Sequence, residues 1–318
     1  MGEGLSVAVL IPTFRRPEEL ARCLAALAAQ RRKPDRVLLV TRAEDEPTQR
    51  VAAGGHDGLA VERVLVATPG QVAALNAGLA AIREDVVAIT DDDSVPRPDW
   101  LARIAAHFAA DPTLGGLGGR DRVHHGERVL EGEMPTVGRL LWYGRFVGFH
   151  HLGAGAPREV DLLKGVNMSY RREAIAGLRF DTRLLGRGAQ HHNDWAMSLA
   201  VKRRGWRVLY DPGIVVDHIE AERQADDPRF AEEPRVAAEH AHNQTYIAVR
   251  YFPRRRALVH VLYVYLVGTT VAPGLGMTLR NLIARRQSPA TSVREMALAL
   301  RSRTAGIATA LRAGRAEP

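Results

Sequence analysis

The chain has 318 residues, is 46% hydrophobic and carries a formal net charge of +8. This is enough apolar material to bury a sizeable core, in one large α/β domain with an appendage or in two small domains. The arginines are scattered and lack interleaved aromatic residues, so the basic excess does not indicate a nucleic-acid partner. Acidic lipids or diphosphate substrates explain the charge as well.

Strands and helices are predicted to alternate over the first 117 residues. Apolar runs predict buried strands, and Pro17 is placed to open a helix in its first turn. The expected strands are Ser6–Ile11, Arg36–Val40, Glu62–Val66, Val86–Thr90 and Leu114–Leu117, and the expected helices begin at Pro17 and cover Gln71–Ile82 and Pro98–Ala110. This order predicts an α/β fold with a Rossmann-like, mostly parallel sheet and helices on both faces. Ligands of such sheets bind beyond the carboxyl ends of the strands.

A single cysteine, Cys23, lies on the apolar face of the helix that Pro17 opens. We expect a buried structural thiol rather than a nucleophile. No disulfide can form within the chain and no secretory signal is visible, which predicts a cytoplasmic location.

Residues 118–161 interrupt the alternation with a stretch rich in Gly, Arg and His that includes Trp142 and Phe146. A segment of this length without regular structure indicates a functional role. Regular structure is expected to return at Asp161–Tyr170, in a helix at Asn193–Arg204, and in two separate strands, Arg207–Tyr210 and Ile214–Val216.

The last part of the chain, residues 221–318, is predicted to be a helical extension. The apolar run Ala257–Ala272 follows the basic cluster Arg254–Arg256 and is short of the roughly 20 residues that span a bilayer. It is either a helix lying on a membrane or a buried hairpin. Ser292–Leu311 predicts a helix whose apolar face must be covered, namely Val293, Met296, Leu300, Thr304, Ile307 and Leu311.

Three adjacent carboxylates, Asp91–Asp93, directly follow the strand Val86–Thr90. Like charges at a strand end are costly to fold unless a cation lies among them, and hard divalent ions prefer carboxylate oxygens. The alternative is a solvated acidic turn. Asp194 at a helix start is either a cap or a carboxylate that accepts a proton from a hydroxyl. His218 is either a third metal ligand or a strand-end histidine.

Two further features have weaker functional interpretations. Asn76 lies on a helix with small residues, which indicates either tight packing or close approach to a nucleotide. The histidine doublets at 124–125, 150–151 and 191–192 suggest zinc only weakly, because adjacent residues point apart on regular elements.

Taken in order, five segments resemble family 2 glycosyltransferases of the GT-A fold. They are VAVLIPTFRRPEELARCLAAL (Val7–Leu27), PGQVAALNAGL (Pro69–Leu79), VAITDDDSVPRPDWL (Val87–Leu101), LLKGVNMSYRREAI (Leu162–Ile175) and NDWAMSLAVKRRGWRVLYDPGIVVDH (Asn193–His218). The resemblance implies a GT-A domain over residues 1–220, with a nucleotide-binding half (1–117) and an acceptor-binding half (118–220). Residues 221–318 would form a helical, membrane-associating region.

The resemblance also implies roles for individual residues, which are carried over by position. The donor nucleotide would contact Pro12, Thr13, Arg15, Asn76, Asp91 and Asp92. Asp93, with Asp92 and His218, would bind Mg²⁺ or Mn²⁺. The acceptor would lie against Gly165, Asn167, Met168 and Trp195, and Asp194 would be the catalytic base of an inverting transfer.

The sequence departs from the family pattern at two positions. The aspartate that commonly recognises the base after the second strand is absent, and Arg42 or Asp45 is expected to substitute. Asn193 stands where the family usually has Glu.

The predicted activity is transfer of a sugar from a nucleotide-diphosphate donor to a hydroxyl of a glycan, a lipid-linked sugar or a small molecule. Such products belong to envelope polysaccharides, glycolipids or natural-product glycosides, and peripheral membrane contact is expected. A sugar-nucleotide pyrophosphorylase and a non-catalytic nucleotide-sugar-binding protein are the alternatives.

Overall fold

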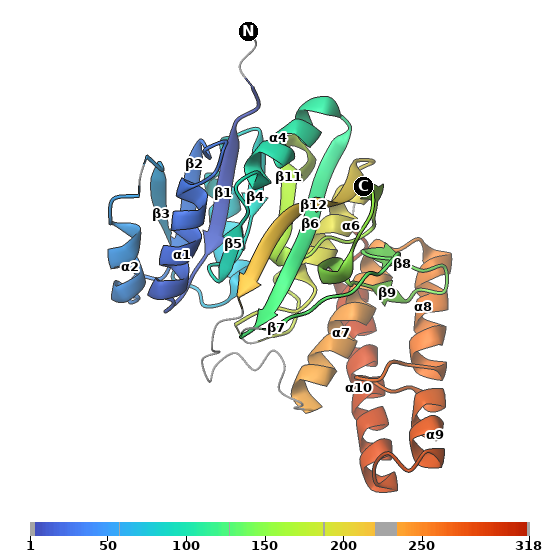
Figure 1. The fold of residues 1–318 in the computed structure, drawn as a ribbon. Helices are drawn as coiled ribbons and strands as arrows, with labels where there is room; N and C mark the ends of the chain where they lie inside the picture. Colours follow the sequence, from blue (N-terminus) through green and yellow to red (C-terminus); the bar gives the residue numbers. More distant parts are fainter. Residues whose placement is uncertain (1–3, 57, 127, 187, 220–233, 317–318) are drawn as a thin grey trace. The chain divides into compact units, whose positions relative to one another are not determined.

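The structure is a computed structural model that describes residues 4–56, 58–126, 128–186, 188–219 and 234–316 (Figure 1). The chain divides into two compact units. Unit 1 comprises Met1–Arg139, Val147–Phe180 and Met197–Glu222, and unit 2 comprises Leu140–Phe146, Asp181–Ala196 and Arg223–Pro318. Residues 221–233 of the predicted C-terminal region lie outside the described residues, as does Glu220.

Unit 1 is built on one sheet. Its strands are β1 (Val7–Pro12), β2 (Arg36–Thr41), β3 (Val61–Leu65), β4 (Val86–Ile89), β5 (Ser94–Pro96), β6 (Leu114–His125), β7 (Arg128–Val129), β10 (Arg158–Glu159), β11 (Met168–Arg171) and β12 (Arg207–Ile219). The helices are α1 (Pro17–Ala28), α2 (Glu46–Ala52), α3 (Gln71–Ala81), α4 (Trp100–Ala110), α5 (Arg172–Ile175) and most of α6 (Asn193–Arg203), with short 3₁₀ turns η1 (His150–Leu152) and η2 (Gly165–Asn167).

The sheet order is β10-β12-β6-β11-β4-β1-β2-β3. Strands β4, β1, β2 and β3 are parallel, β6 and β12 are parallel, and β11 runs antiparallel between β4 and β6. The expected mostly parallel sheet is therefore confirmed. Two short strands, β8 (Arg139–Leu140) and β9 (Phe146–Val147), pair with each other separately.

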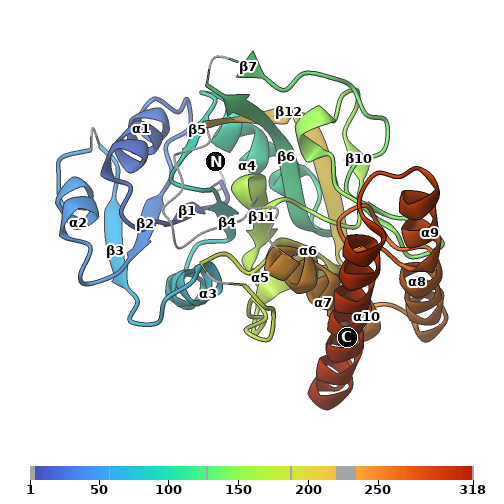
Figure 2. The same cartoon turned by 90° about the horizontal axis from the view of Figure 1, so that it is seen from below.

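Helices cover both faces of this sheet, as expected from its nearly continuous apolar strands. Alternate residues of β1 enter different cores: Val9 packs with α1 and α4, whereas Leu10 packs with α3. Figure 2 shows α1 and α3 on opposite sides of the strands. Cys23 of α1 is fully buried, and burial raises the pKa of its thiol to about 12. This supports the structural interpretation of the thiol.

The structure corrects the predicted break after Leu117. Strand β6 continues to His125, because its glycines allow close approach: a Cβ on Gly119 would lie 2.0 Å from the carbonyl oxygen of Ile214. The two strands predicted near Arg207 and Ile214 form the single strand β12. Its register against β6 shifts between Asp211 and Val215, where Pro212, Gly213 and Ile214 have no partner on β6.

Unit 2 consists mainly of α7 (Pro234–Tyr251), α8 (Arg254–Leu266), α9 (Leu275–Ile283) and α10 (Pro289–Ala313). The helical extension is confirmed, but the predicted covered face of α10 is wrong. Val293 and Leu311 are exposed, and the buried face consists of Ser292, Ala299, Arg303, Gly306 and Ala310. Gly306 is required where α10 approaches α7, because a Cβ at this position would lie 2.5 Å from the carbonyl oxygen of His242. Arg303 on the same face instead donates to the carbonyl of Pro273.

None of the described helices is long and apolar enough to cross a bilayer.

Candidate active site

The predicted functional loops after β1 and β4 emerge side by side because these two strands pair in parallel, with Val9 opposite Ala88. Arg16, in the loop after β1, contacts both carboxylates of the β4 loop. Its Nη1 lies 3.1 Å from Asp92 Oδ1 and 3.0 Å from Asp93 Oδ2. The carboxyl edge of the sheet thus brings an arginine and three aspartates together.

Hydroxyl groups fix the turn that carries the aspartates. Thr90 Oγ1 donates a hydrogen bond of 2.8 Å to the carbonyl of Val166, and Ser94 Oγ donates one of 2.7 Å to the carbonyl of Asp91. Thr90 and Ser94 are fully buried. The turn is therefore held in one conformation by its own flanking residues.

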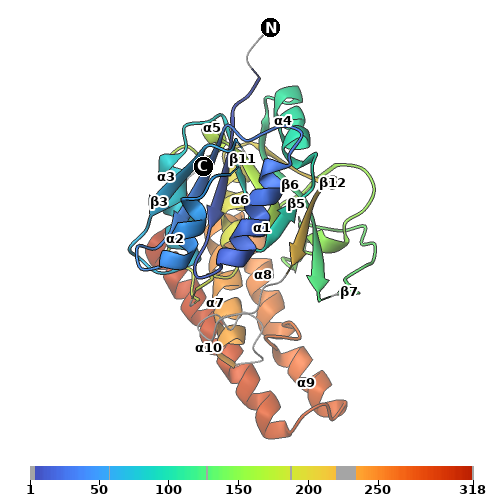
Figure 3. The same cartoon turned by 60° about the vertical axis from the view of Figure 1, so that its left-hand side comes forward.

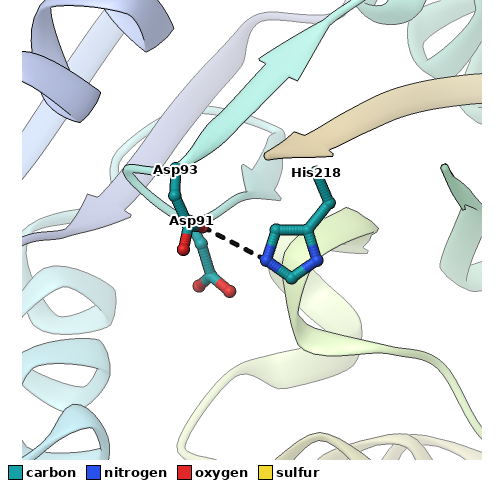
Figure 4. A group of neighbouring side chains, drawn as sticks. All are labelled: Asp91, Asp93 and His218. Carbon is teal, nitrogen blue, oxygen red and sulfur yellow. Dashed lines mark ion pairs between the residues drawn. The ribbon is translucent and has the colours of Figure 1, made fainter. Parts of the chain in front are cut away.

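His218 reaches this turn through strand pairing. β5 pairs antiparallel with β12, which places His218 opposite Ser94, and the backbone N–H of Ile219 donates to the carbonyl of Asp93 at 3.0 Å. His218 Nε2 lies 3.3 Å from Asp93 Oδ1 (Figure 4). One ligand atom from each of Asp91, Asp93 and His218 lies within 4.8 Å of the other two.

Burial and like charges shape the protonation of this group. Burial raises the pKa of Asp92 to about 7, and Asp93 and Asp91 add to the rise while Arg16 opposes it. Burial lowers the pKa of His218, but its contact with Asp93 outweighs burial and leaves the pKa above its usual value. The raised pKa of His218 reflects the negative charge of Asp93 and Asp91, which a cation would neutralise.

The residues present fit a hard divalent cation. Asp91 and Asp93 offer carboxylate oxygens and His218 an imidazole nitrogen, a donor set that Mn²⁺ or Mg²⁺ accepts together with diphosphate oxygens. The structure groups Asp91 with Asp93 and His218, whereas Asp92 is 4% exposed and faces Arg16. The role of Asp92 as a ligand stays a prediction. No other such group occurs among the residues the structure describes, so the histidine doublets gain no support as zinc sites.

The predicted nucleotide-side residues lie on the loops after β1 and β2. Pro12 ends β1, and the backbone N–H of Thr13 donates to Val40 at 2.9 Å. Arg15 has a left-handed backbone with φ of 53°, and its N–H donates to Asp45, whose other oxygen accepts from Thr48 N. Asp45 therefore links the two loops as the N-cap of α2.

Arg42, the other expected substitute for the base-recognising aspartate, lies beside an aromatic ring. The guanidinium carbons of Arg42 and Arg15 lie 5.0 and 4.9 Å from the ring centroid of Phe14, and Arg42 also pairs with Glu44. Its contact with a nucleotide base stays a prediction.

Two predicted ligand contacts have side chains engaged in structural bonds. Asn76 Nδ2 donates to Phe180 O at 2.9 Å, and its Oδ1 accepts from Phe180 N at 2.8 Å. Asn167 Oδ1 accepts from the indole of Trp100 at 2.9 Å, and its Nδ2 donates to the carbonyl of Ile214 at 2.9 Å. These bonds give both side chains a structural role, and their contact with a ligand stays a prediction.

Gly165 and Met168, the other predicted acceptor contacts of this segment, lie beside the turn that carries the three aspartates. Gly165 begins η2, and Met168 opens β11 opposite Ile89 of β4. Their neighbour Val166 accepts the hydrogen bond from Thr90. The segment thus borders the turn that carries the aspartates.

Asp194 and Trp195 belong to unit 2, at the first turn of α6. Within this unit Trp195 is stacked between His192, at 4.1 Å between ring centroids, and Phe146, at 5.0 Å. Asp194 Oδ1 accepts from the N–H of Trp195 at 2.9 Å. The predicted base, Asp194, therefore lies in the sequence between His192 and Trp195, whose rings stack on each other.

Arg16 was missing from the predicted site residues. The sequence contained a signal for it, because Arg16 is a basic residue in the loop that follows β1, and β1 is the neighbour of β4 in the sheet. Only the pairing of β1 with β4 shows that this arginine meets the aspartates.

The profile of "Glycosyltransferase like family 2" matches residues 4–233. The chain belongs to this family. The family 2 match covers the sheet of unit 1 together with all the motifs that carried the predicted resemblance, so the expected membership is confirmed.

Two comparisons with known proteins agree with the family. Over 157 residues the chain is 29% identical to the pre-mycofactocin glycosyltransferase of Mycobacterium tuberculosis, in strains CDC 1551 / Oshkosh and H37Rv. The alignment covers 47% of this family 2 chain and 30% of that relative, so the chain spans about a third of the length of the curated relatives it matches.

Solved structures confirm the GT-A fold. The mannosyltransferase PcManGT of Pyrobaculum calidifontis, in complex with GDP-Man and Mn²⁺, is 18% identical with a TM-score of 0.57, over 98% of this chain and 87% of that one. S. aureus TarS, in complex with UDP-GlcNAc, is 14% identical with a TM-score of 0.62, over 98% of this chain and 93% of that one.

Proposed function

We propose that this family 2 protein is a metal-dependent glycosyltransferase that transfers a sugar, with inversion, from a nucleotide-diphosphate donor to an acceptor hydroxyl. The observation that carries the proposal is the cluster of Asp91, Asp93 and His218 within 4.8 Å at the carboxyl edge of the sheet. This edge is where ligands of open α/β sheets bind. The solved relatives with the same fold are complexes with GDP-Man and Mn²⁺ and with UDP-GlcNAc, which supports a nucleotide-sugar donor.

Several residues of the chain are placed to stabilise the diphosphate as a leaving group. Asp91, Asp93 and His218 would hold Mg²⁺ or Mn²⁺, which would neutralise the charge that develops on the leaving diphosphate. Arg16 lies 3.0 Å from Asp93 and so provides a fixed positive charge beside the same position. Gly165 and Met168 border the turn that carries the aspartates, and they would line the acceptor side.

Asp194 accepts the proton of the attacking hydroxyl. A carboxylate in the first turn of a helix is stabilised as an anion by the helix dipole, which keeps it ready to accept. Attack from the face opposite the leaving diphosphate requires both substrates to be held in line, and one displacement inverts the anomeric centre.

The first experiment is isothermal calorimetry of the full chain with GDP, UDP, ADP and dTDP, each with Mn²⁺, with Mg²⁺ and with chelator. We expect at least one nucleotide to bind only when the cation is present. Equal affinity in chelator and in Mn²⁺ would show that the carboxylate cluster does not hold a metal with the donor.

The second experiment determines the reaction type. With nucleotide sugars that carry the nucleotide found in the first experiment as donors, proton NMR of the product should show an axial donor linkage converted to an equatorial product linkage. Retained configuration excludes a single displacement with Asp194 as base, and release of a nucleoside triphosphate on addition of pyrophosphate points to a pyrophosphorylase instead.

A further inference from the structure

Exposed apolar side chains gather on two helices of unit 2. Among the residues that the structure describes, eight of the fifteen exposed large apolar side chains lie between residues 258 and 283. They are Leu258, Leu262, Leu266, Val267, Val271, Leu275, Leu279 and Ile283, which we call the α8–α9 face. Leu258 is 61% exposed and Ile283 is 75% exposed, so the helices of the same unit leave this face uncovered.

On both helices the exposed apolar side chains lie on a different side from the buried residues. On α8 the buried residues are Ala257, His260 and Val264, while the leucines four residues apart from 258 to 266 point outward. On α9 Thr278 is buried, and residues 275, 279 and 283 repeat the same outward spacing. Residues four apart share one side of a helix, so each helix presents a continuous apolar stripe.

The two stripes are joined rather than independent. The backbone N–H of Met277 donates to the carbonyl of Val267 at 3.1 Å, which fastens the start of α9 to the end of α8. Arg303 of α10, itself 1% exposed, donates to the carbonyl of Pro273 at 3.3 Å and holds the intervening turn. Figures 1 and 3 show α8 and α9 one after the other alongside α10.

An aromatic turn in the same unit lies next to α8. His260 Nδ1 donates to the carbonyl of Gly144 at 2.7 Å, and Tyr143 packs on Tyr263 of α8 at 5.2 Å between ring centroids. The neighbouring Trp142 is 78% exposed. Trp and Tyr are the side chains that favour the boundary between water and lipid.

The positive charge of the protein is concentrated in this part of the chain. Residues 254–318 contain eleven Arg, no Lys or Asp and two Glu, a formal charge of +9, so residues 1–253 carry −1 of the chain's +8. Arg254, Arg255, Arg280, Arg285 and Arg286 are exposed beside the apolar stripes. An apolar face with a basic border is complementary to an anionic lipid surface.

We propose that the α8–α9 face docks on an anionic lipid bilayer, with its leucines among the acyl chains and its arginines at the headgroups. Neither helix is long enough to cross, so both lie in the interface. A second copy of the chain is the less suitable occupant, because pairing through this face brings two surfaces of the same strong positive charge together. The proposal concerns unit 2 alone and stands whether or not unit 1 transfers a sugar.

The test is co-sedimentation of the full chain with vesicles of phosphatidylcholine alone or mixed with phosphatidylserine. We expect sedimentation with the mixed vesicles at low salt and much less with phosphatidylcholine alone or at high salt. Leu262→Ser combined with Leu279→Ser should weaken binding by about tenfold per leucine. Arg254→Gln combined with Arg255→Gln should weaken it by about fivefold per arginine.

Leu65→Ser combined with Arg63→Gln, two exposed positions on β3 of unit 1, is the matched control and should bind like the parent. The proposal is overturned if the parent fails to sediment with the mixed vesicles at low salt, or if the control loses as much binding as the α8–α9 variants. It is also overturned if the leucine variant converts a dimer to a monomer, by light scattering, while vesicle binding is unchanged. That outcome would assign the face to a second copy.

Discussion

Each unit of the protein contains a cluster of titratable side chains. The histidine pKa is raised in one cluster and lowered in the other. In unit 1 His218 faces Asp93, and this contact raises its pKa despite burial. In unit 2 the rings face one another: His191 stacks on His240 at 4.1 Å, and His240 Nδ1 lies 2.9 Å from His192 Nε2. Burial lowers the pKa of His192 far below its usual value, and its two histidine neighbours lower it further.

The difference follows from the charge of the surroundings. Beside carboxylates a positive charge is stabilised, whether it is a proton on His218 or a metal ion held between His218 and the aspartates. In unit 2 burial disfavours positive charge on His192 and His240, and the neighbouring histidines disfavour it further on His192, whose ring stacks on Trp195. The first cluster is suited to binding a cation, and the second to supporting the helix start that carries Asp194.

The largest expected effect comes from removing a carboxylate of the unit 1 cluster. Asp93→Ala should lower turnover by about 10³ or more, because several kcal/mol of charge stabilisation depend on the held cation. Metal-dependent nucleotide binding, measured by calorimetry, should weaken in parallel. Glu133→Ala, an exposed carboxylate of unit 1, is the control and should behave like the parent. Parental turnover in Asp93→Ala would remove the cluster from the chemistry.

Asp194→Asn should affect turnover without affecting donor binding. The amide keeps the size and the capping capacity but cannot accept a proton, so turnover should fall by about 10²–10⁴. Donor affinity should remain at the parental value, unlike in Asp93→Ala. The variant is compared by steady-state kinetics on the true acceptor and by calorimetry with the donor nucleotide. Turnover close to the parent would reduce Asp194 to a helix-end carboxylate.

His218→Asn tests whether the imidazole is a ligand. Losing one of several donors should weaken Mn²⁺ binding by about 10–100-fold, a cost of about 1.4–2.8 kcal/mol. The matched control is His107→Asn, since His107 also pairs with an aspartate in unit 1, at 2.8 Å from Asp211. Binding can be followed by electron paramagnetic resonance of Mn²⁺. An equal loss in both variants would show a general structural effect rather than ligation.

The smallest expected effect is the pH dependence of the unit 2 cluster. A histidine whose folded pKa is depressed is neutral in the folded protein, while the unfolded chain takes up a proton below about pH 6.5. Its contribution to stability is therefore present above that pH and is lost as pH falls, by up to about 1.4 kcal/mol per pH unit for each such group. His192→Asn should reduce this slope in urea denaturation between about pH 6.5 and 5.

Asparagine is the appropriate replacement at position 192 because the backbone there is left-handed, with φ of 69°, and Asn tolerates this conformation. His56→Asn, a histidine of unit 1, serves as the control. An unchanged slope in His192→Asn would mean that the ring titrates alike in the folded and unfolded chain, which would contradict the contrast between the two clusters.

The sequence by itself determined the family and the strands β1 to β4 with the helices α1, α3 and α4, and it pointed to the carboxylates that the structure brings together with His218. Asp91–Asp93 and His218 were recognisable because short polar runs follow apolar strands, and such runs meet at one edge of a parallel sheet. The buried Cys23 was also predictable, because helical spacing places it among leucines. The burial of Cys23 depends only on local periodicity, whereas the family depends on five motifs taken in order.

Tertiary structure decided what depends on pairing and close packing. The three-residue strand β5 is too short to recognise in a sequence, yet its register with β12 brings His218 to Asp93. The covered face of α10 contains Ser292, Gly306 and Ala310 rather than its larger apolar residues, and the close approach of α7 leaves no room for a Cβ at Gly306. The apolar run after Arg256 likewise divides into buried and exposed faces only when α8 has neighbours on one side. The hydrophobicity of a side chain indicates that its burial is favourable, whereas the geometry of the neighbouring elements determines whether it is buried.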